Sequence, residues 1–286
     1  MKSIVALSGG ILIAGLVFAS PKFAQQTGSE SSTISPKPAS ATSAKADRSS
    51  PIAAGEKLNY VASWSNFLMA GRLSLSVQES PDKKSFLLHA DAETVGLVKA
   101  LYNMSNHYDS TLEKSTLLPN LFSIRSKDLS KPGAADKQSE VKFDQTKHVA
   151  KTVDDSISIA PQTYDLISIV YAMRMLDLKP GKKYPLAGFD GKNKFSLEAE
   201  VMGTESVDVG GEPNRGIKVA VSYGKDGETP NDENEIRIWF SEDVKHTPLI
   251  ISANPPFGLI KVELRIPGAP TNGTKRAMPR EDPIKP

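Results

Sequence analysis

Alternating apolar and polar positions dominate the middle of the chain. Leu73, Leu75 and Val77, for example, alternate with serine and glutamine. Successive side chains of an extended strand point to opposite faces, so a period of two predicts strands with one buried and one solvated face. The segments with this period are 58–64, 73–77, 86–92, 195–201, 217–223 and 260–266. One-faced strands of this kind are typical of antiparallel sheets.

Only two segments have the spacing of a helix. The first runs from Asp165 to Leu176, with Thr163 as a candidate cap and Lys179-Pro180-Gly181 as the stop. The second runs from Gly96 to Met104. Many one-faced strands with few helices predict a mainly β fold. We expect a strongly curved antiparallel sheet, a half-barrel, with one or two short helices packed on or in its concave face.

The ends of the chain differ in composition from this middle part. Residues 1–19 have a positive start and an apolar run too short to span a bilayer, which predicts a signal peptide, with cleavage as late as residue 24 as the alternative. Residues 20–54 are rich in Ser, Thr, Ala and Pro and predict a disordered linker, and residues 269–286 predict a disordered Pro-rich tail. A single β-rich domain at 55–268 remains. We therefore expect an exported protein without a stable membrane span in the mature chain, periplasmic or, alternatively, extracellular.

Charge and cysteine content narrow the class of protein. The 286 residues contain 35 Lys and Arg against 33 Asp and Glu, a formal net charge of +2, which argues against a nucleic-acid partner. The chain has no cysteine, which excludes disulfides, thiolate metal sites, a cysteine nucleophile and a lipidated N-terminal cysteine. An exported chain without disulfides has to be stabilised by its core.

Several short motifs occur in an order that resembles a known family. They include the opening Gly55-Glu56-Lys57-Leu58-Asn59-Tyr60, the segments 94–102 and 115–119, and the closing runs 236–243, 247–251 and 256–258. In this order they resemble the bacterial domain of unknown function 3108, over residues 55–266. The resemblance implies an exported, mostly β domain of the cell envelope with no established activity. The strand, Trp, acidic turn, Pro and strand pattern near the C-terminus is also similar, more loosely, to periplasmic lipoprotein-carrier half-barrels.

Large apolar side chains supply the leading functional hypothesis. We predict a non-enzymatic envelope protein that binds an apolar or lipid-like ligand in the half-barrel, near the mouth formed by the helix at 96–104. The candidate cavity residues are Trp64, Leu68, Leu97, Leu101, Tyr102, Trp239 and Phe257. The alternative is a structural or protein-interaction module, of unknown partner, in which these residues are ordinary core and the helix at 165–176 fills the concavity. Trp239 has the opposite strand parity to Ile236 and Ile238, so it requires either a register shift or a second apolar surface.

Histidine and carboxylate residues supply a third hypothesis, a metal-dependent enzyme. His89-x-Asp91-x-Glu93 and His107-x-Asp109 each place potential ligands on one face of a strand, and the two sets would meet if the strands were neighbours. The other interpretation is that both are solvated strand faces, and our prediction includes no metal or cofactor. The sequence contains no Gly-x-Ser-x-Gly, His-Glu-x-x-His, Walker or dinucleotide motif, so we predict no enzymatic activity.

Overall fold

The computed structural model describes residues 51–65, 68–101, 103–129, 136–225, 228–254 and 258–266, with the backbone alone at 101, 225 and 231–234. The predicted signal peptide, most of the predicted linker and the predicted tail lie outside the described residues. So do Tyr102, Phe257 and the side chain of Leu101.

The described residues form strands and two short helices. The strands are β1 (Lys57–Trp64), β2 (Leu68–Glu79), β3 (Ser85–Thr94), β4 (Met104–Glu113), β5 (Pro119–Asp128), β6 (Lys137–Asp144), β7 (Val149–Lys151), β8 (Ser156–Ser158), β9 (Thr163–Tyr164), β10 (Lys183–Phe189), β11 (Lys194–Val209), β12 (Glu212–Lys225), β13 (Asn231–Ser241), β14 (Pro248–Ala253) and β15 (Ile260–Leu264). The helices are α2 (Gly96–Leu101) and α3 (Ser168–Arg174).

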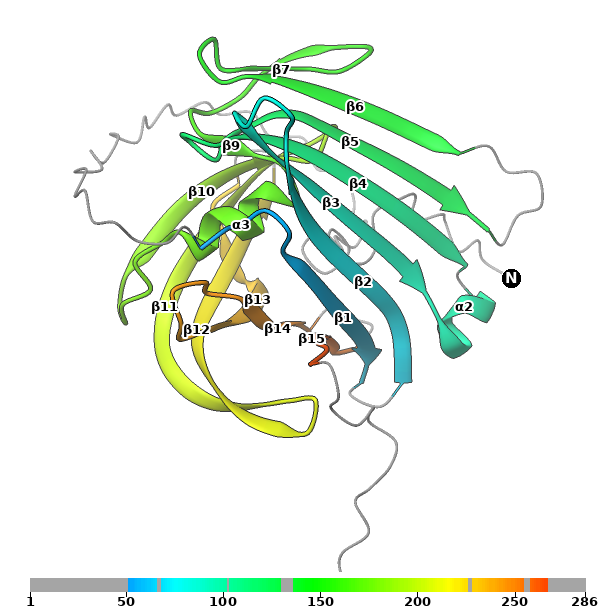
Figure 1. The fold of residues 1–286 in the computed structure, drawn as a ribbon, viewed down its shortest axis with the longest axis vertical. Coiled ribbons are helices and arrows are strands. Elements are labelled where there is room, and N and C mark those ends of the chain that lie inside the picture. The colour runs from blue at the N-terminus through cyan, green and yellow to red at the C-terminus, as the bar shows by residue number, and fades with distance from the viewer. Residues whose placement is uncertain are drawn as a thin grey trace, which may run out of the picture.

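All the described strands belong to one 15-stranded sheet that is strongly curved and not closed (Figure 1). From β1 to β8 each strand pairs with the next, and the same holds from β9 to β15. β1 pairs with β15, so the two meanders join where the folded unit begins and ends, and β8 and β9 form the free edges. The pairs are antiparallel except β9 and β10, which are joined by a crossover through α3. The predicted fold class, a curved antiparallel sheet with short helices, is confirmed.

Side chains close part of the gap between the two ends of the sheet. Phe143 of β6 packs edge-on against Phe189 of β10, with ring centroids 6.4 Å apart. Gln145 Nε2, in the β6–β7 turn, donates to the carbonyl oxygen of Thr163 in β9 at 2.9 Å. These contacts hold the sheet in its rolled shape without a backbone ladder between β8 and β9.

The alternation in the sequence fixes which face of each strand is buried. In β3, Leu88 and Ala90 are fully buried, whereas His89 and Asp91 point to the outer face. A shift of one residue would exchange the two sets, so a single buried face specifies the register. The predicted strands are therefore confirmed together with their inward faces.

Helix α3 is shorter than predicted and is buried on every side. All seven of its residues are buried, and Figure 1 shows it inside the curve of the sheet. Thr163 does not cap it, because Thr163 lies in β9. Asp165 serves instead: its Oδ1 accepts the backbone N–H groups of Ile167 and Ser168 at 2.8 and 2.9 Å.

Helix α2 ends at Leu101, three residues before the predicted end. Met104 instead begins β4, where its N–H bonds the Thr94 hydroxyl at 2.9 Å. Gly96 begins the helix with φ of +60°, and a Cβ there would lie 3.0 Å from the Met69 carbonyl oxygen. A glycine is therefore required where the chain turns from β3 into α2 against β2.

Candidate functional site

Three of the predicted cavity residues lie at one end of the sheet. Trp64 ends β1 and pairs with Leu68, which begins β2. Leu97 lies in α2, which packs against β2, and is 71% exposed. We call this end, defined by the exposed side chains of Met69, Leu97 and Leu129, the α2 rim. Leu129 belongs to it because its N–H bonds the carbonyl oxygen of Asn103, two residues after α2.

Trp239 lies apart from the α2 rim, on the outer face of the sheet. Its neighbours in β13, Ile238 and Phe240, point into the main core, whereas Trp239 packs with the separate cluster of Val209, Leu249 and Ile250. Its indole N–H donates to Glu205 at 2.6 Å. Both explanations that the sequence left open apply, because the pairing of β13 with β14 shifts register between Trp239 and Phe240 and Trp239 packs on a second apolar surface. Trp239 does not share a cavity with Trp64 and Leu97.

Helix α3 occupies the concave face where a ligand cavity was expected. Ile167, Ile169 and Met173 are at most 3% exposed and belong to the main core. A helix that is apolar on all sides is stable only inside a protein, and here the curved sheet supplies its surroundings. The space next to α3 is therefore packed core.

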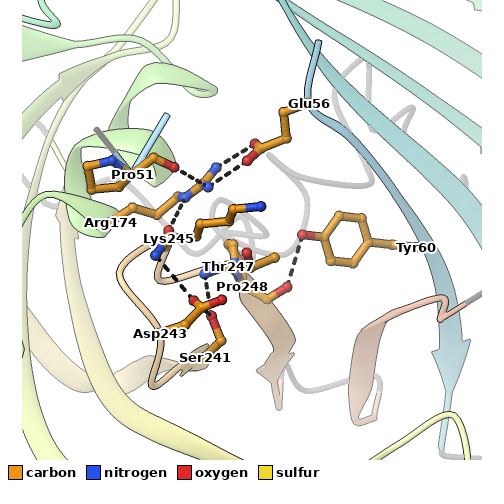
Figure 2. A network of polar contacts seen from close by, with 9 residues as sticks. All are labelled: Pro51, Glu56, Tyr60, Arg174, Ser241, Asp243, Lys245, Thr247 and Pro248. Atoms are coloured by element: carbon orange, nitrogen blue, oxygen red, sulfur yellow. Dashed lines mark hydrogen bonds and ion pairs between the residues drawn. The ribbon is translucent and has the colours of Figure 1, made fainter. Parts of the chain in front are cut away.

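One charged residue of α3, Arg174, anchors a polar network in this interior (Figure 2). Its side chain is 1% exposed and forms a two-fold ion pair with Glu56, with N–O distances of 2.6 and 2.7 Å. The guanidinium also donates to the carbonyl oxygens of Pro51 at 2.7 Å and Lys245 at 3.0 Å. Burial by itself lowers the pKa of Arg174, but the bonds and charge of Glu56 outweigh it and raise the pKa, so Arg174 stays charged.

The network ties together three parts of the chain that are far apart in sequence. Glu56 precedes β1, Arg174 ends α3, and Lys245 lies in the loop between β13 and β14. In the same region the hydroxyl of Tyr60 donates to the carbonyl oxygen of Pro248 at 2.9 Å. Four of the five guanidinium N–H groups of Arg174 thus bond within the protein, which gives the network a structural role.

Arg174 and Glu56 were not singled out from the sequence. A signal was present, because Arg174 lies among apolar residues in the segment 165–176 that was predicted to be a helix packed on or in the concave face. A charge in such a position needs a buried partner. Nothing in the sequence indicated that the partner is Glu56, 118 residues away. Ile52, which we assigned to the linker, is also buried, so the folded unit begins before residue 55.

The histidine and aspartate residues of β3 and β4 do come together. The two strands are neighbours, and their register places His89 opposite Asp109 and Asp91 opposite His107. His89 Nδ1 lies 2.5 Å from Asp109 Oδ1, and His107 Nδ1 lies 2.6 Å from Asp91 Oδ1. The sequence predicted a shared site only if the two strands were neighbours, and they are. We call these four residues the His–Asp cluster.

The His–Asp cluster lies on the outer, solvated face beside a groove with several charged residues in its lining. The groove has a volume of about 400 Å³, and Asp91 belongs to its lining together with Arg72, Glu93 and Arg265. Arg72 and Glu93 form an ion pair at 3.6 Å. Glu93, the third residue of the first motif, therefore points to the groove and is not part of the cluster.

Among the described residues, no helix is both long and apolar enough to cross a membrane.

Comparison with solved structures shows the fold that this geometry belongs to. The chain is similar to a β-barrel-like protein of domain of unknown function DUF1849 from Brucella abortus, with a TM-score of 0.52 and 12% identity over 73% of this chain and 94% of that one. It also matches a DUF1089 family protein from Pseudomonas aeruginosa, with a TM-score of 0.34 and 7% identity over 63% of this chain and 88% of that one. No curated protein matches the sequence.

A family model of proteins of unknown function, DUF3108, matches residues 59–265. This range covers the sheet from the third residue of β1 to β15 and includes α3, the Arg174 side of the interior network and the His–Asp cluster. The family predicted by resemblance is confirmed: the chain belongs to the DUF3108 family.

Proposed function

We propose that the protein is a non-enzymatic, exported module of the cell envelope that binds another envelope protein, with the α2 rim as its contact surface. The observation that carries this proposal is the complete burial of α3 within the concave face. A carrier of lipid-like ligands needs an apolar cavity in that position, whereas a filled interior leaves the rim and the outer face for binding.

The α2 rim has the character of a contact surface. Met69, Leu97 and Leu129 are 41%, 71% and 45% exposed; Leu97 lies in α2, the Met69 carbonyl oxygen lies next to Gly96 at its start, and Leu129 bonds Asn103 after its end. Large apolar side chains gathered on a surface mark sites of association. The N-terminal apolar run supports export. The proposal of a non-enzymatic protein is supported by the ionisable groups of the interior, Glu56, Asp165 and Arg174, because they bond to other groups of the protein.

The same exposed rim favours a second candidate, binding of a single amphiphilic ligand at the rim. Apolar rim residues bind an acyl chain as readily as an apolar protein surface. The two candidates predict different adducts at the same position, so one experiment separates them.

The experiment uses the absence of cysteine from the chain. A Leu97→Cys variant, produced in its own host and coupled to a photoactivatable thiol reagent, gives a single crosslinking position on the rim. The matched control is Val153→Cys, because Val153 lies in the β7–β8 turn and is 88% exposed. We expect a discrete protein adduct at residue 97 and none at residue 153.

Other outcomes decide against the proposal. A lipid adduct at residue 97, together with lipid found by native mass spectrometry of the purified protein, would favour the second candidate. Equal labelling at residues 97 and 153, or no adduct at either, would show that the α2 rim is not a specific contact surface.

A further inference from the structure

We propose that the His–Asp cluster binds one divalent transition-metal ion through His89, His107 and Asp109. One donor atom of each residue lies within 4.8 Å of the other two. His89 Nδ1 and His107 Nε2 approach the same oxygen, Asp109 Oδ1, at 2.5 and 3.1 Å. The three donors therefore converge on one point on the outer face of the sheet. This inference is independent of the proposed function.

The backbone holds these donors in place. They lie in the central parts of β3 and β4, two long strands in continuous register, and alternate with the buried residues Leu88, Ala90 and Tyr108. Ligands on paired strands are positioned more accurately than ligands on loops. The ion would join the two strands without any change in the fold.

The hydrogen bonds around His107 leave a position for a cation. Both of its ring nitrogens face carboxylate oxygens, with Nδ1 2.6 Å from Asp91 and Nε2 3.1 Å from Asp109. A neutral imidazole carries one N–H, so it can donate to only one of the two carboxylates. The other nitrogen then presents its lone pair to an oxygen, an arrangement that a metal ion bound by both atoms would stabilise.

Asp91 and Arg125 have positioning roles. In the tautomer with its proton on Nδ1, His107 donates to Asp91 and keeps a free Nε2 lone pair, the arrangement commonly found behind metal-binding histidines. Arg125 Nη2 lies 3.7 Å from Asp109 Oδ2, the oxygen that faces away from the histidines. With neutral histidine rings, the two carboxylates Asp91 and Asp109 outweigh the single guanidinium of Arg125, so the cluster has a net negative charge. The nearby Arg72 and Glu93 neutralise each other.

The donor set selects the class of metal. Two imidazole nitrogens with one carboxylate oxygen suit zinc and its neighbours in the first transition row rather than calcium or magnesium, which prefer oxygen alone. The side chains of His89, His107 and Asp109 are 29%, 31% and 33% exposed, so the remaining coordination positions face solvent. Such a site is open to water or to a further ligand.

Zinc titration of the tag-free, metal-stripped protein tests the proposal. Calorimetry is expected to give one ion per chain with release of protons, and the melting temperature is expected to rise with zinc concentration. Asp91→Asn should weaken binding by about 10–100-fold, because it removes an orienting partner. His107→Asn removes a ligand and should weaken binding further.

A second histidine provides the matched control. His148 is exposed in the β6–β7 turn with φ of 53°, a conformation that asparagine tolerates, so His148→Asn should bind zinc like the wild type. All variants should melt as the wild type does in the absence of zinc, because the changed side chains lie on the outer face. The proposal would be overturned by binding of less than one zinc ion per chain, or by equal zinc affinity in the wild type and His107→Asn. It would also be overturned if His148→Asn lost as much zinc affinity as His107→Asn.

Discussion

Among single residues, Arg174 connects more of the protein than any other side chain in the interior network. It binds the segment before β1 through Glu56 and Pro51, and it binds the β13–β14 loop through Lys245. Its guanidinium carbon also lies over the ring of Tyr171, 5.0 Å from the ring centroid. Because the pair is buried, loss of one partner leaves the other charge without compensation.

Glu56→Gln should therefore lower the free energy of unfolding by about 3–5 kcal/mol, the usual cost of leaving one charge of a buried pair alone. The double variant Glu56→Gln/Arg174→Met removes both charges and should lose less than the sum of the two single variants. Chemical denaturation of the wild type, Glu56→Gln, Arg174→Met and the double variant gives the coupling energy between the two residues. Additive losses would show that the pair is not coupled.

An exposed pair of the same residue types provides the control. Arg215 Nε lies 2.9 Å from Glu242, with 68% and 42% of the two side chains exposed. Glu242→Gln should leave the denaturation midpoint close to that of the wild type, because exposed ion pairs contribute little. A loss as large as that of Glu56→Gln would mean that burial is not the cause.

Contacts between single residues were the part of the structure that the sequence predicted least well. The pairing of His89 with Asp109 followed once β3 and β4 were neighbours, because both residues have the outward parity of their strands. The pairing of Arg174 with Glu56 depends on where α3 lies within the curved sheet, and periodicity carries no information on that position. Trp239 was placed in the cavity set although its parity pointed to the opposite face, which is where it packs.

At the scale of elements, α3 is stabilised by the residues around its first turn. Asp165 is fully buried, caps the helix through the backbone N–H groups of Ile167 and Ser168, and accepts a bond from Ser110 of β4 at 2.5 Å. Its own N–H bonds the hydroxyl of Ser168 at 2.8 Å, a reciprocal capping arrangement. The start of the helix is thereby fixed to the sheet.

Asp165→Asn and Asp165→Ala should behave differently. Asparagine keeps the oxygen that accepts the two N–H groups, so its free energy of unfolding at neutral pH should remain close to that of the wild type. Alanine removes the cap and leaves buried donors without acceptors, which should cost about 1–3 kcal/mol. Thermal unfolding of the two variants at one pH distinguishes a capping role from a simple packing role, for which both changes would have similar effects.

The charge of Asp165 adds a dependence on pH. Burial raises its pKa above the ordinary aspartate value, and the bonds from Ser110, Ser168 and Ile167 only partly oppose this effect. The folded protein therefore binds more protons at this site than the unfolded chain as the pH rises from about 4, the unfolded value. The contribution of Asp165 to stability is full below that value and is lost as the pH rises through the folded pKa. The wild type should thus lose stability relative to Asp165→Asn between pH 4 and neutral pH, and a constant difference would contradict this.

Element types and strand parity were predictable because both depend on local periodicity. The six predicted strands correspond to β1, β2, β3, β11, β12 and β15. Helix ends were predicted less well. Met104 continues the apolar spacing of α2, yet its N–H is bonded by Thr94 within the sheet, so tertiary pairing overrode local preference.

At the scale of the whole molecule, the first and last strands of the sheet, β1 and β15, pair with each other. The free edges are instead β8 and β9, which follow one another in the sequence. β1 and β15 pair through five residue pairs, and the N–H of Arg265 also bonds the carbonyl oxygen of Asn59 at 2.7 Å. The free edges β8 and β9 are separated in sequence by residues 159–162 alone. No pattern in the sequence predicted which strands are neighbours in the sheet. The short turns between strands nevertheless favoured pairing of consecutive strands, as in the two meanders.

This arrangement predicts that the chain can be circularly permuted at its open seam. Joining Ile266 to Pro51 through a flexible linker of about ten residues, which spans about 17 Å, would connect the segment after β15 to the segment before β1, two strands that already pair. New termini between Pro161 and Gln162 would fall in an exposed segment that belongs to neither edge strand. The permuted protein should show the circular dichroism of the wild type and a single cooperative unfolding transition.

Removal of β15 is the contrasting change. A chain that ends at Leu259 loses Val262, which is fully buried, and exposes the unpaired edges of β1 and β14. Such edges pair with other chains, so this protein should aggregate or remain unfolded. If the permutant unfolded as readily as the truncated chain, the covalent link across residues 159–162 would be essential to the fold. If both folded, the β1–β15 pairing would not be what holds the two meanders together.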